Sequence, residues 1–441
     1  MSESTGQTAA APRARDLDGL LRQCVQCGLC LPHCATWLAT GHDAQSPRGR
    51  LLLLADTLSG PGSPAAGQAY LEAFDQCIGC RACETACPSG VPFSLLAYGQ
   101  HLAQGPGGPA GGKAVAAGVP AWVVRRLDSR SFLARLRVAG AFGRKVAAGL
   151  LGARWRRRLD GMGGPVARAG RLLGSLPTSV TADQDLVDRL DRIRGVRSRW
   201  QPLVAAPKPG AQVLFFEGCA NAGLLPGSGR RLKELLAAAG CRVESPAGQT
   251  CCGALAGHTG RPGRQAGLRH ANVEALAGPD PVVVEAAGCS LELKDGDPDL
   301  AARVVDASCF LSTLDLPALA PLDLKVVVHD PCHGRHGQGI VAEPRALLGR
   351  IPGVTILEAA EAEVCCGAGG VWGLRYPELS ADLGARKARM LADTAADVIV
   401  TTNPGCLGQI ADGLLADGQE LPIMPLGDLL WYAAAVAAGD A

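Results

Sequence analysis

Eight cysteines in the N-terminal part of the chain form two runs with the same spacing, C-x2-C-x2-C-x3-C. The runs are Cys24, Cys27, Cys30, Cys34 and Cys77, Cys80, Cys83, Cys87. Thiolates at this spacing bind [4Fe-4S] clusters, and the fourth cysteine of each run joins the cluster of the other run. We therefore predict that cluster one is bound by Cys24, Cys27, Cys30 and Cys87, and cluster two by Cys77, Cys80, Cys83 and Cys34.

Zinc is the main alternative for these runs, because paired C-x2-C units also build tetrahedral zinc sites. A zinc ribbon uses two cysteines in each unit, however, whereas each unit here has four. Disulfide bonds between these cysteines are expected even less than zinc. The cysteines of this 441-residue chain have metal-ligand spacing, and the expected setting is a reducing cytoplasm.

A second group of eight cysteines forms a duplicated pattern in the C-terminal half. Each copy has a cysteine after an apolar strand, then Cys-Cys-Gly, then a fourth cysteine, and the copies are Cys219, Cys251, Cys252, Cys289 and Cys332, Cys365, Cys366, Cys406. An internal duplication explains the repeated spacing. Because open α/β sheets bind ligands at the carboxyl ends of their strands, each copy is a candidate for a further cluster, a zinc ion or a redox thiol site. Ordinary buried cysteines are the alternative.

Other cysteines and histidines lie outside these patterns. Cys241 and Cys309 have no counterpart in the other copy and are expected to pack in the core. His329, His333 and His336 lie close to Cys332 in the sequence. They are candidates for lowering thiol pKa values or moving protons, and local hydrogen bonding is the alternative.

The elements that position these residues follow from the apolar pattern. Short apolar strands are expected at 213–216, 282–285, 326–329 and 398–401, alternating with helical segments such as 229–239 and 378–394. This alternation favours parallel α/β units. The 42 residues between Cys34 and Cys77 contain a helix-like stretch at 50–56, so we expect short helices to hold the N-terminal cysteine loops.

The predicted fold is a multidomain α+β chain. Hydrophobic residues make up 47% of it and charged residues 19%, which fits a soluble globular protein. We expect a disordered leader (1–16), a ferredoxin-type domain with two clusters (17–100), a linker and basic helical connector (101–210), and two cysteine-rich α/β domains (211–318 and 319–441). The leader has no apolar signal region.

The connector carries the chain's net excess of positive charge. Between residues 121 and 171 there are thirteen Lys or Arg residues and two Asp residues, and Phe132, Leu133, Leu136, Val138 and Phe142 are spaced as in amphipathic helices. This stretch is either a solvated connector or a docking site for a partner subunit or the anionic membrane surface. Arginines interrupt the best candidate for a membrane span, at residues 132–151. We expect at most peripheral membrane contact and no nucleic-acid partner.

Together, the two cysteine runs, the Ser46-Pro47-Arg48-Gly49-Arg50 segment and the two Cys-Cys-Gly copies resemble the iron–sulfur subunit of bacterial glycolate oxidase. The resemblance implies partner subunits that contain FAD, one of which oxidises glycolate to glyoxylate. It also implies that this chain passes the electrons on, with a membrane quinone as the expected acceptor. We assign no catalytic residue to this chain, because it lacks a G-x-G-x-x-G fingerprint after a strand.

Three other functions stay open. The relay could serve a D-lactate dehydrogenase or an anaerobic glycerol-3-phosphate dehydrogenase instead. The cysteine-rich copies also resemble those of heterodisulfide reductases, in which the copies themselves would reduce a disulfide. The fullest form of that motif ends in C-x2-C, whereas this chain has Glu292 and Gln409 at the second position. This chain therefore lacks the extra cysteine that a noncubane cluster of that type uses.

Overall fold

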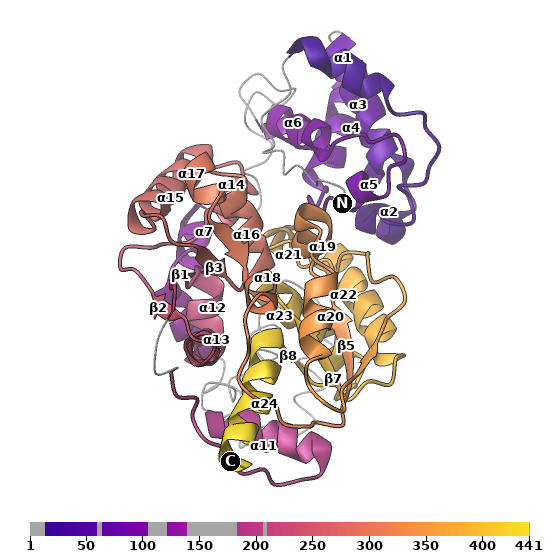
Figure 1. Cartoon of the computed structure of the whole chain (residues 1–441). Helices are drawn as coiled ribbons and strands as arrows, with labels where there is room; N and C mark the ends of the chain where they lie inside the picture. Colours follow the sequence, from indigo (N-terminus) through magenta and orange to yellow (C-terminus); the bar gives the residue numbers. More distant parts are fainter. Residues whose placement is uncertain (1–13, 60–63, 105–120, 139–182, 206–209, 441) are drawn as a thin grey trace.

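The computed structural model describes the chain except residues 1–13, 60–63, 105–120, 139–182, 206–209 and 441. Figure 1 shows a helical N-terminal part that lies at one end of two α/β repeats. Within the described ranges, none of the helices combines the length and apolar character that crossing a membrane requires.

The N-terminal part is built of short helices. They are α1 (Ala14–Arg22), α2 (Ala35–Thr40), the 3-10 helix η1 (Asp43–Gln45), α3 (Pro47–Ser59), α4 (Pro64–Asp75), α5 (Ala82–Thr85) and α6 (Phe93–Gln104). Leu54, Tyr70, Phe74 and Leu95 are fully buried between α3, α4 and α6. A Cβ atom at Gly99 would lie 2.3 Å from the Phe74 ring, so the glycine allows α6 to approach α4 closely. The helical character predicted for this part is confirmed.

The first repeat is a parallel sheet with strand order β2-β1-β3-β4. Its strands are β1 (Gln212–Phe216), β2 (Arg242–Glu244), β3 (Val282–Val284) and β4 (Val304–Asp306). Its helices are α12 (Cys219–Leu224), α13 (Pro226–Ala238), α14 (Ala254–Gly257), α15 (Pro262–Ala275), α16 (Ala287–Lys294), α17 (Pro298–Ala301) and α18 (Ala307–Ser312).

The second repeat has the equivalent order, β6-β5-β7-β8, again all parallel. Its strands are β5 (Lys325–His329), β6 (Thr355–Leu357), β7 (Val398–Thr401) and β8 (Ile423–Pro425). Its helices are α19 (Cys332–Gln338), α20 (Ala342–Leu348), α21 (Trp372–Arg375), α22 (Pro377–Ala392), α23 (Pro404–Ala416) and α24 (Leu426–Asp440). The four predicted strands are the central strands β1, β3, β5 and β7. The duplicated α/β fold predicted from the sequence is confirmed.

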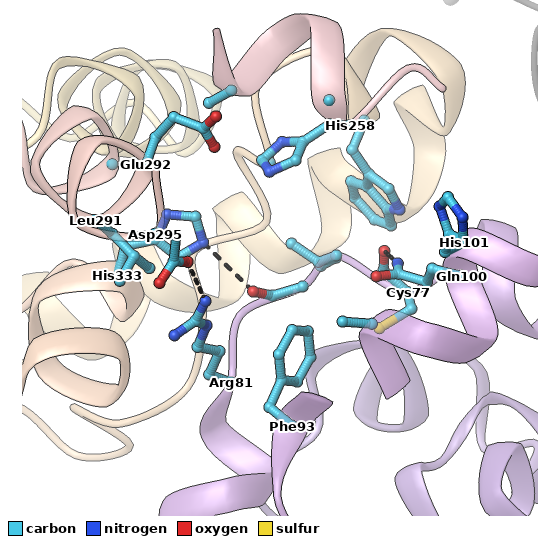
Figure 2. Close-up of a pocket in the computed structure, with 18 of the residues that line it drawn as sticks. Cys77, Arg81, Phe93, Gln100, His101, His258, Leu291, Glu292, Asp295 and His333 are labelled. Atoms are coloured by element: carbon cyan, nitrogen blue, oxygen red, sulfur yellow. Dashed lines mark hydrogen bonds and ion pairs between the residues drawn. The ribbon is translucent and has the colours of Figure 1, made fainter. Parts of the chain in front are cut away.

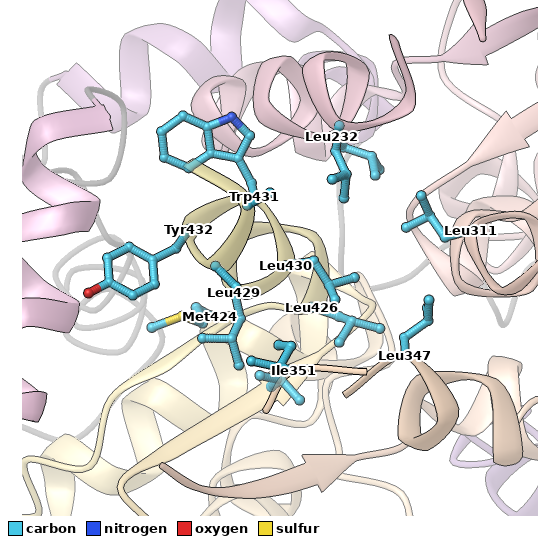
Figure 3. Close-up of a cluster of buried hydrophobic side chains, with 14 of the residues drawn as sticks. Leu232, Leu311, Leu347, Ile351, Met424, Leu426, Leu429, Leu430, Trp431 and Tyr432 are labelled. Carbon is cyan, nitrogen blue, oxygen red and sulfur yellow. The ribbon is translucent and has the colours of Figure 1, made fainter. Parts of the chain in front are cut away.

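The two repeats pack reciprocally, so that each contact of one copy has its counterpart in the other. Helix α13 contacts α24 and helix α18 contacts α20, while α16 meets α19 and α12 meets α23. Figure 3 shows the buried cluster that results, in which Leu232 and Leu311 of the first repeat face Leu347 and Trp431 of the second. Because α12, α16, α19 and α23 follow the central strands, this packing brings the carboxyl edges of both sheets together.

In the described part of the basic connector, the helices within 121–138 pack on the first repeat, whereas the last helix contacts α24 of the second repeat. This part consists of α7 (Ala121–Leu127), a helical stretch at 130–138 and, after a gap, α11 (Asp183–Arg194). Leu133 is buried against the first repeat, and Arg264 donates to Asp128 over 2.6 Å. Val138 remains 57% exposed. Phe142 and most of the predicted leader, linker and connector lie outside the described residues.

Candidate functional site

The cysteines predicted to hold cluster two line one small cavity. Cys34 caps the start of α2, Cys77 follows α4, Cys83 lies in α5, and Cys80 lies on the loop between them. All four thiols border the cavity, so the fourth cysteine of the first run has joined the first three of the second run. Burial and neighbouring thiols raise the pKa values of Cys80 and Cys83 well above the ordinary range. Thiolates at these buried positions therefore need a bound cation to stabilise them.

The cysteines predicted to hold cluster one lie nearer the surface. Cys24 and Cys87 pack partly against the core of α3, α4 and α6, whereas Cys27 is exposed. The Gln26 amide donates to the Cys24 sulfur over 3.3 Å, and the backbone N–H of Val91 donates to the Cys87 sulfur over 3.4 Å.

The two cysteine loops share an unusual backbone. In each run the second and fourth residues after the first cysteine have positive φ: Gln26 and Gly28 in one, Gly79 and Arg81 in the other. Left-handed backbone at these points curls the chain and turns successive cysteines toward one side. The glycine is the second residue of the pair in the first run and the first residue in the second run. The two runs therefore share the loop conformation, although the residue types differ.

Arg50 is a buried cation beside the Cys34 sulfur. It is 1% exposed, and its guanidinium donates to the Ala73 carbonyl (2.7 Å), Gln45 Oε1 (3.0 Å), Thr36 Oγ1 (3.1 Å) and Cys34 Sγ (3.9 Å). None of these partners is a carboxylate. Because a buried charge is costly unless it is compensated, Arg50 requires an anion at this place. A cluster bound by thiolates is such an anion, and so the surroundings of Cys34 fit the predicted cofactor.

Replacing Arg50 by Gln should lower the reduction potential of cluster two. One unit charge about 6 Å away, at an effective dielectric constant of about 20, changes that potential by on the order of 100 mV. The measurement is an anaerobic redox titration followed by electron paramagnetic resonance. Arg48→Gln is the control, since its partly exposed guanidinium pairs with Asp43 over 2.9 Å and should leave the potential nearly unchanged. Equal potentials in both variants would contradict the assignment.

The eight cysteines of the duplicated pattern line a single cavity of about 190 Å³, the thiol cavity. The sequence pattern alone led us to expect one pocket in each copy. The reciprocal packing of the repeats explains the difference, because it places both carboxyl edges face to face. The walls between the thiols are largely apolar, and Ile78 of the N-terminal part closes one side.

The thiols of each copy lie in contact. The sulfurs of Cys219 and Cys251 are 3.4 Å apart in the first copy, and those of Cys332 and Cys365 are 3.8 Å apart in the second. Hydrogen bonds from Cys219 and Cys252 lower the pKa of Cys251. The spacing of free thiols in both copies suits binding of one metal centre by several sulfurs. Cys241 and Cys309 lie apart from this cavity. Cys241 packs in the core, as predicted, whereas Cys309 is only partly buried.

The three predicted histidines occupy different surroundings. His329 is buried within 4.8 Å of the sulfurs of Cys366 and Cys406, and burial lowers its pKa to about 3. His333 lines the thiol cavity, and its ring contacts the Gly79 carbonyl over 3.3 Å. His336 links the repeats to the N-terminal part through Thr85 Oγ1 (2.6 Å) and the Glu363 carbonyl (2.7 Å).

A third cavity, which is polar and has a volume of about 400 Å³, opens between the N-terminal part and the repeats (Figure 2). Cys77 borders it on one side and Glu292 on the other, and an ion pair between Arg81 and Asp295 crosses it. His258 and His333 line both this cavity and the thiol cavity, so the two spaces adjoin. His258 was not predicted, because a lone histidine after α14 carries no sequence signal. The volume is within the range of small-molecule sites.

The predicted cluster-two site lies directly against the second repeat. Cys80 packs in one cluster with Cys332 and Cys365. The Trp372 indole donates to the Gln76 carbonyl over 3.0 Å, and Arg375 and Tyr376 both bond to Asp75. The contact therefore places the cysteines of cluster two next to those of the C-terminal cavity.

Comparison with known proteins agrees with the division of the chain into an N-terminal part and two repeats. Residues 20–91 match the 4Fe-4S dicluster domain family, and residues 213–294 and 326–411 each match the Cysteine-rich domain family. The chain is 30% identical to the probable glycolate oxidase iron–sulfur subunit of Bacillus subtilis, over 95% of both chains. It is 28% identical to the glycolate oxidase iron–sulfur subunit of Escherichia coli, over 90% of this chain and 92% of that one. The chain is also 26% identical to the lactate utilization protein A of Oceanobacillus iheyensis. This match covers 50% of this chain and 96% of that protein.

Proposed function

The chain belongs to the family of glycolate oxidase iron–sulfur subunits, and we propose that it carries electrons away from the FAD of a partner subunit that oxidises glycolate to glyoxylate. A membrane quinone, or another acceptor, receives the electrons. The single observation that carries this proposal is the arrangement of the cysteines. They form a continuous series from an exposed thiol at the surface to a cavity enclosed by the two repeats.

Electrons enter at cluster one, whose ligands are Cys24, Cys27, Cys30 and Cys87. Cys27 is exposed, and its neighbours Val25 and Leu29 are 68% and 55% exposed. Exposed apolar side chains around a redox centre favour contact with a partner protein. The FAD-containing subunit therefore docks on this surface.

Cluster two is the next centre, bound by Cys77, Cys80, Cys83 and Cys34. It lies between cluster one and the thiol cavity, because Cys80 packs against Cys332 and Cys365. The thiols of the second C-terminal copy lie beyond it and supply ligands for a further metal, which takes no part in the relay. A flavin can be reoxidised in single-electron steps, so a row of one-electron centres matches its chemistry.

Electrons leave near the polar cavity. Cys77 lines that cavity, which is open enough for a small acceptor to approach cluster two. The subunit works in the cytoplasm, where peripheral contact with the inner membrane would bring a quinone within reach.

The test is anaerobic co-purification of the full chain with its FAD-binding partners, followed by iron, sulfide, zinc and flavin analysis. We expect a flavin-containing complex, with iron and sulfide sufficient for two [4Fe-4S] clusters on this chain. Glycolate should bleach the flavin and reduce the clusters faster than D-lactate or glycerol 3-phosphate does. A colourless zinc protein, or a complex reduced only by one of the other substrates, would overturn the proposal.

A further inference from the structure

We infer that His329 is a metal ligand and that, with Cys366 and Cys406, it binds a zinc ion in the second repeat only. This inference deepens the proposed role of the C-terminal cysteines as metal ligands. It does not depend on the electron relay. The repeats would then differ in chemistry although they share one fold.

The fold brings the three ligands together at the edge of the second sheet. His329 is the last residue of β5, Cys406 lies in the first turn of α23 directly after β7, and Cys366 lies on the Cys-Cys-Gly turn. One ring nitrogen and both sulfurs lie within 4.8 Å of one another. The residues are only 3%, 4% and 1% exposed, respectively.

One ring nitrogen of the histidine lacks the partner that a structural role would supply. The Nε2 atom of His329 is buried and has no hydrogen-bond partner among the described residues. Buried polar atoms are normally hydrogen-bonded, so an unpartnered one calls for an explanation such as a bound ion. The Cys406 sulfur, by contrast, is held in place by the Asn403 side-chain amide, 3.4 Å away.

Two sulfurs and one imidazole form a ligand set that suits zinc. With Zn–S near 2.3 Å and Zn–N near 2.1 Å, tetrahedral ligands lie roughly 3.5–3.8 Å apart. The three ligand atoms lie within 4.8 Å of one another, so small side-chain movements bring them to the spacing of zinc ligands. Three protein ligands leave a fourth position open, as in catalytic zinc sites. Cys366 and Cys406 line the shared thiol cavity, so the open position faces it.

The first repeat cannot form the same site. Its strand β1 ends in Phe216 where β5 ends in His329. The thiols of Cys252 and Cys289 correspond to those of Cys366 and Cys406, but no nitrogen ligand accompanies them at that strand end. Because phenylalanine occupies the equivalent position in the first repeat, His329→Phe is a substitution that this fold already tolerates.

The experiment measures zinc in the full chain, purified anaerobically, by elemental analysis and by X-ray absorption at the zinc edge. The wild type should contain one zinc per chain with mixed sulfur and nitrogen ligation. His329→Phe should lose at least ~10-fold in zinc affinity, as removal of a ligand requires. His329→Cys should retain zinc with sulfur-only ligation, and Cys289→Ala in the first copy should retain the wild-type signal.

Three outcomes would overturn the inference. They are wild-type protein without zinc, unchanged zinc in His329→Phe, and equal loss of zinc in Cys289→Ala. If His329 instead binds a buried water beside Thr401, the wild-type protein will contain no zinc. Iron and sulfide of the two N-terminal clusters, measured on the same samples, should be equal in all variants, so failure of the relay proposal is detected separately.

Discussion

Cys80→Ser should stop electron delivery to the acceptor while the partner flavin is still reduced by glycolate. Cys80 is proposed to bind cluster two, and it packs against Cys332 and Cys365 of the second repeat. Changes around a metal site that spare its ligands already cost about 10–100-fold in affinity or activity, so losing a ligand should cost more than ~100-fold in acceptor reduction. Stopped-flow absorption measures flavin bleaching, and steady-state assays with a quinone analogue measure delivery.

Cys309→Ser is the matched control for this experiment. Cys309 is a partly buried thiol outside both cysteine patterns, and burial raises its pKa to about 12. It should stay a neutral thiol, and its removal should leave both flavin reduction and delivery nearly unchanged. If acceptor reduction persisted at the wild-type rate in Cys80→Ser, the relay through cluster two would be wrong.

The sequence predicted the central strands well and the edge strands not at all. The central strands β1, β3, β5 and β7 are buried on both faces, so they appear as unbroken apolar runs. The edge strands are three residues long, and β2 reads Arg242-Val243-Glu244 with both charged residues exposed. Such a segment becomes a strand because β1 offers it hydrogen-bond partners, which is tertiary information.

The cysteines were predictable because their spacing is local, whereas their surroundings depend on packing between distant segments. The C-x2-C-x2-C-x3-C runs determine how close neighbouring thiols lie, and the ferredoxin scheme, in which the fourth cysteine joins the cluster of the other run, predicted Cys34 together with Cys77. That the two copies share one cavity depends on contacts such as α16 with α19, which no spacing encodes. His258 and the buried Arg50 acquire their roles only once helices far apart in the sequence meet.

Arg231→Met should lower the free energy of unfolding by about 3–5 kcal/mol. Arg231 of α13 and Asp428 of α24 form a two-pronged ion pair between the repeats, with both N···O distances at 2.9 Å and side chains 0% and 1% exposed. Removing the arginine leaves the Asp428 carboxylate buried without its main counter-charge, which is the costly step. Urea unfolding followed by circular dichroism measures the change.

Two variants separate this explanation from a general effect of losing an arginine. Arg230→Met removes a guanidinium that is 41% exposed and pairs with Asp183 and Glu234, so it should cost about 1 kcal/mol or less. The double variant Arg231→Met/Asp428→Leu removes both buried charges and should recover most of the lost stability.

The same ion pair should also control access to the thiol cavity, because it joins the two helices that clamp the repeats together. In Arg231→Met the cysteines of the cavity should react faster with N-ethylmaleimide than in the wild type, under conditions where the chain stays folded. Arg230→Met should react at the wild-type rate. Destabilisation without faster labelling would mean that the repeats loosen elsewhere and that the cavity is held by its own contacts, above all those of α16 with α19 and α12 with α23.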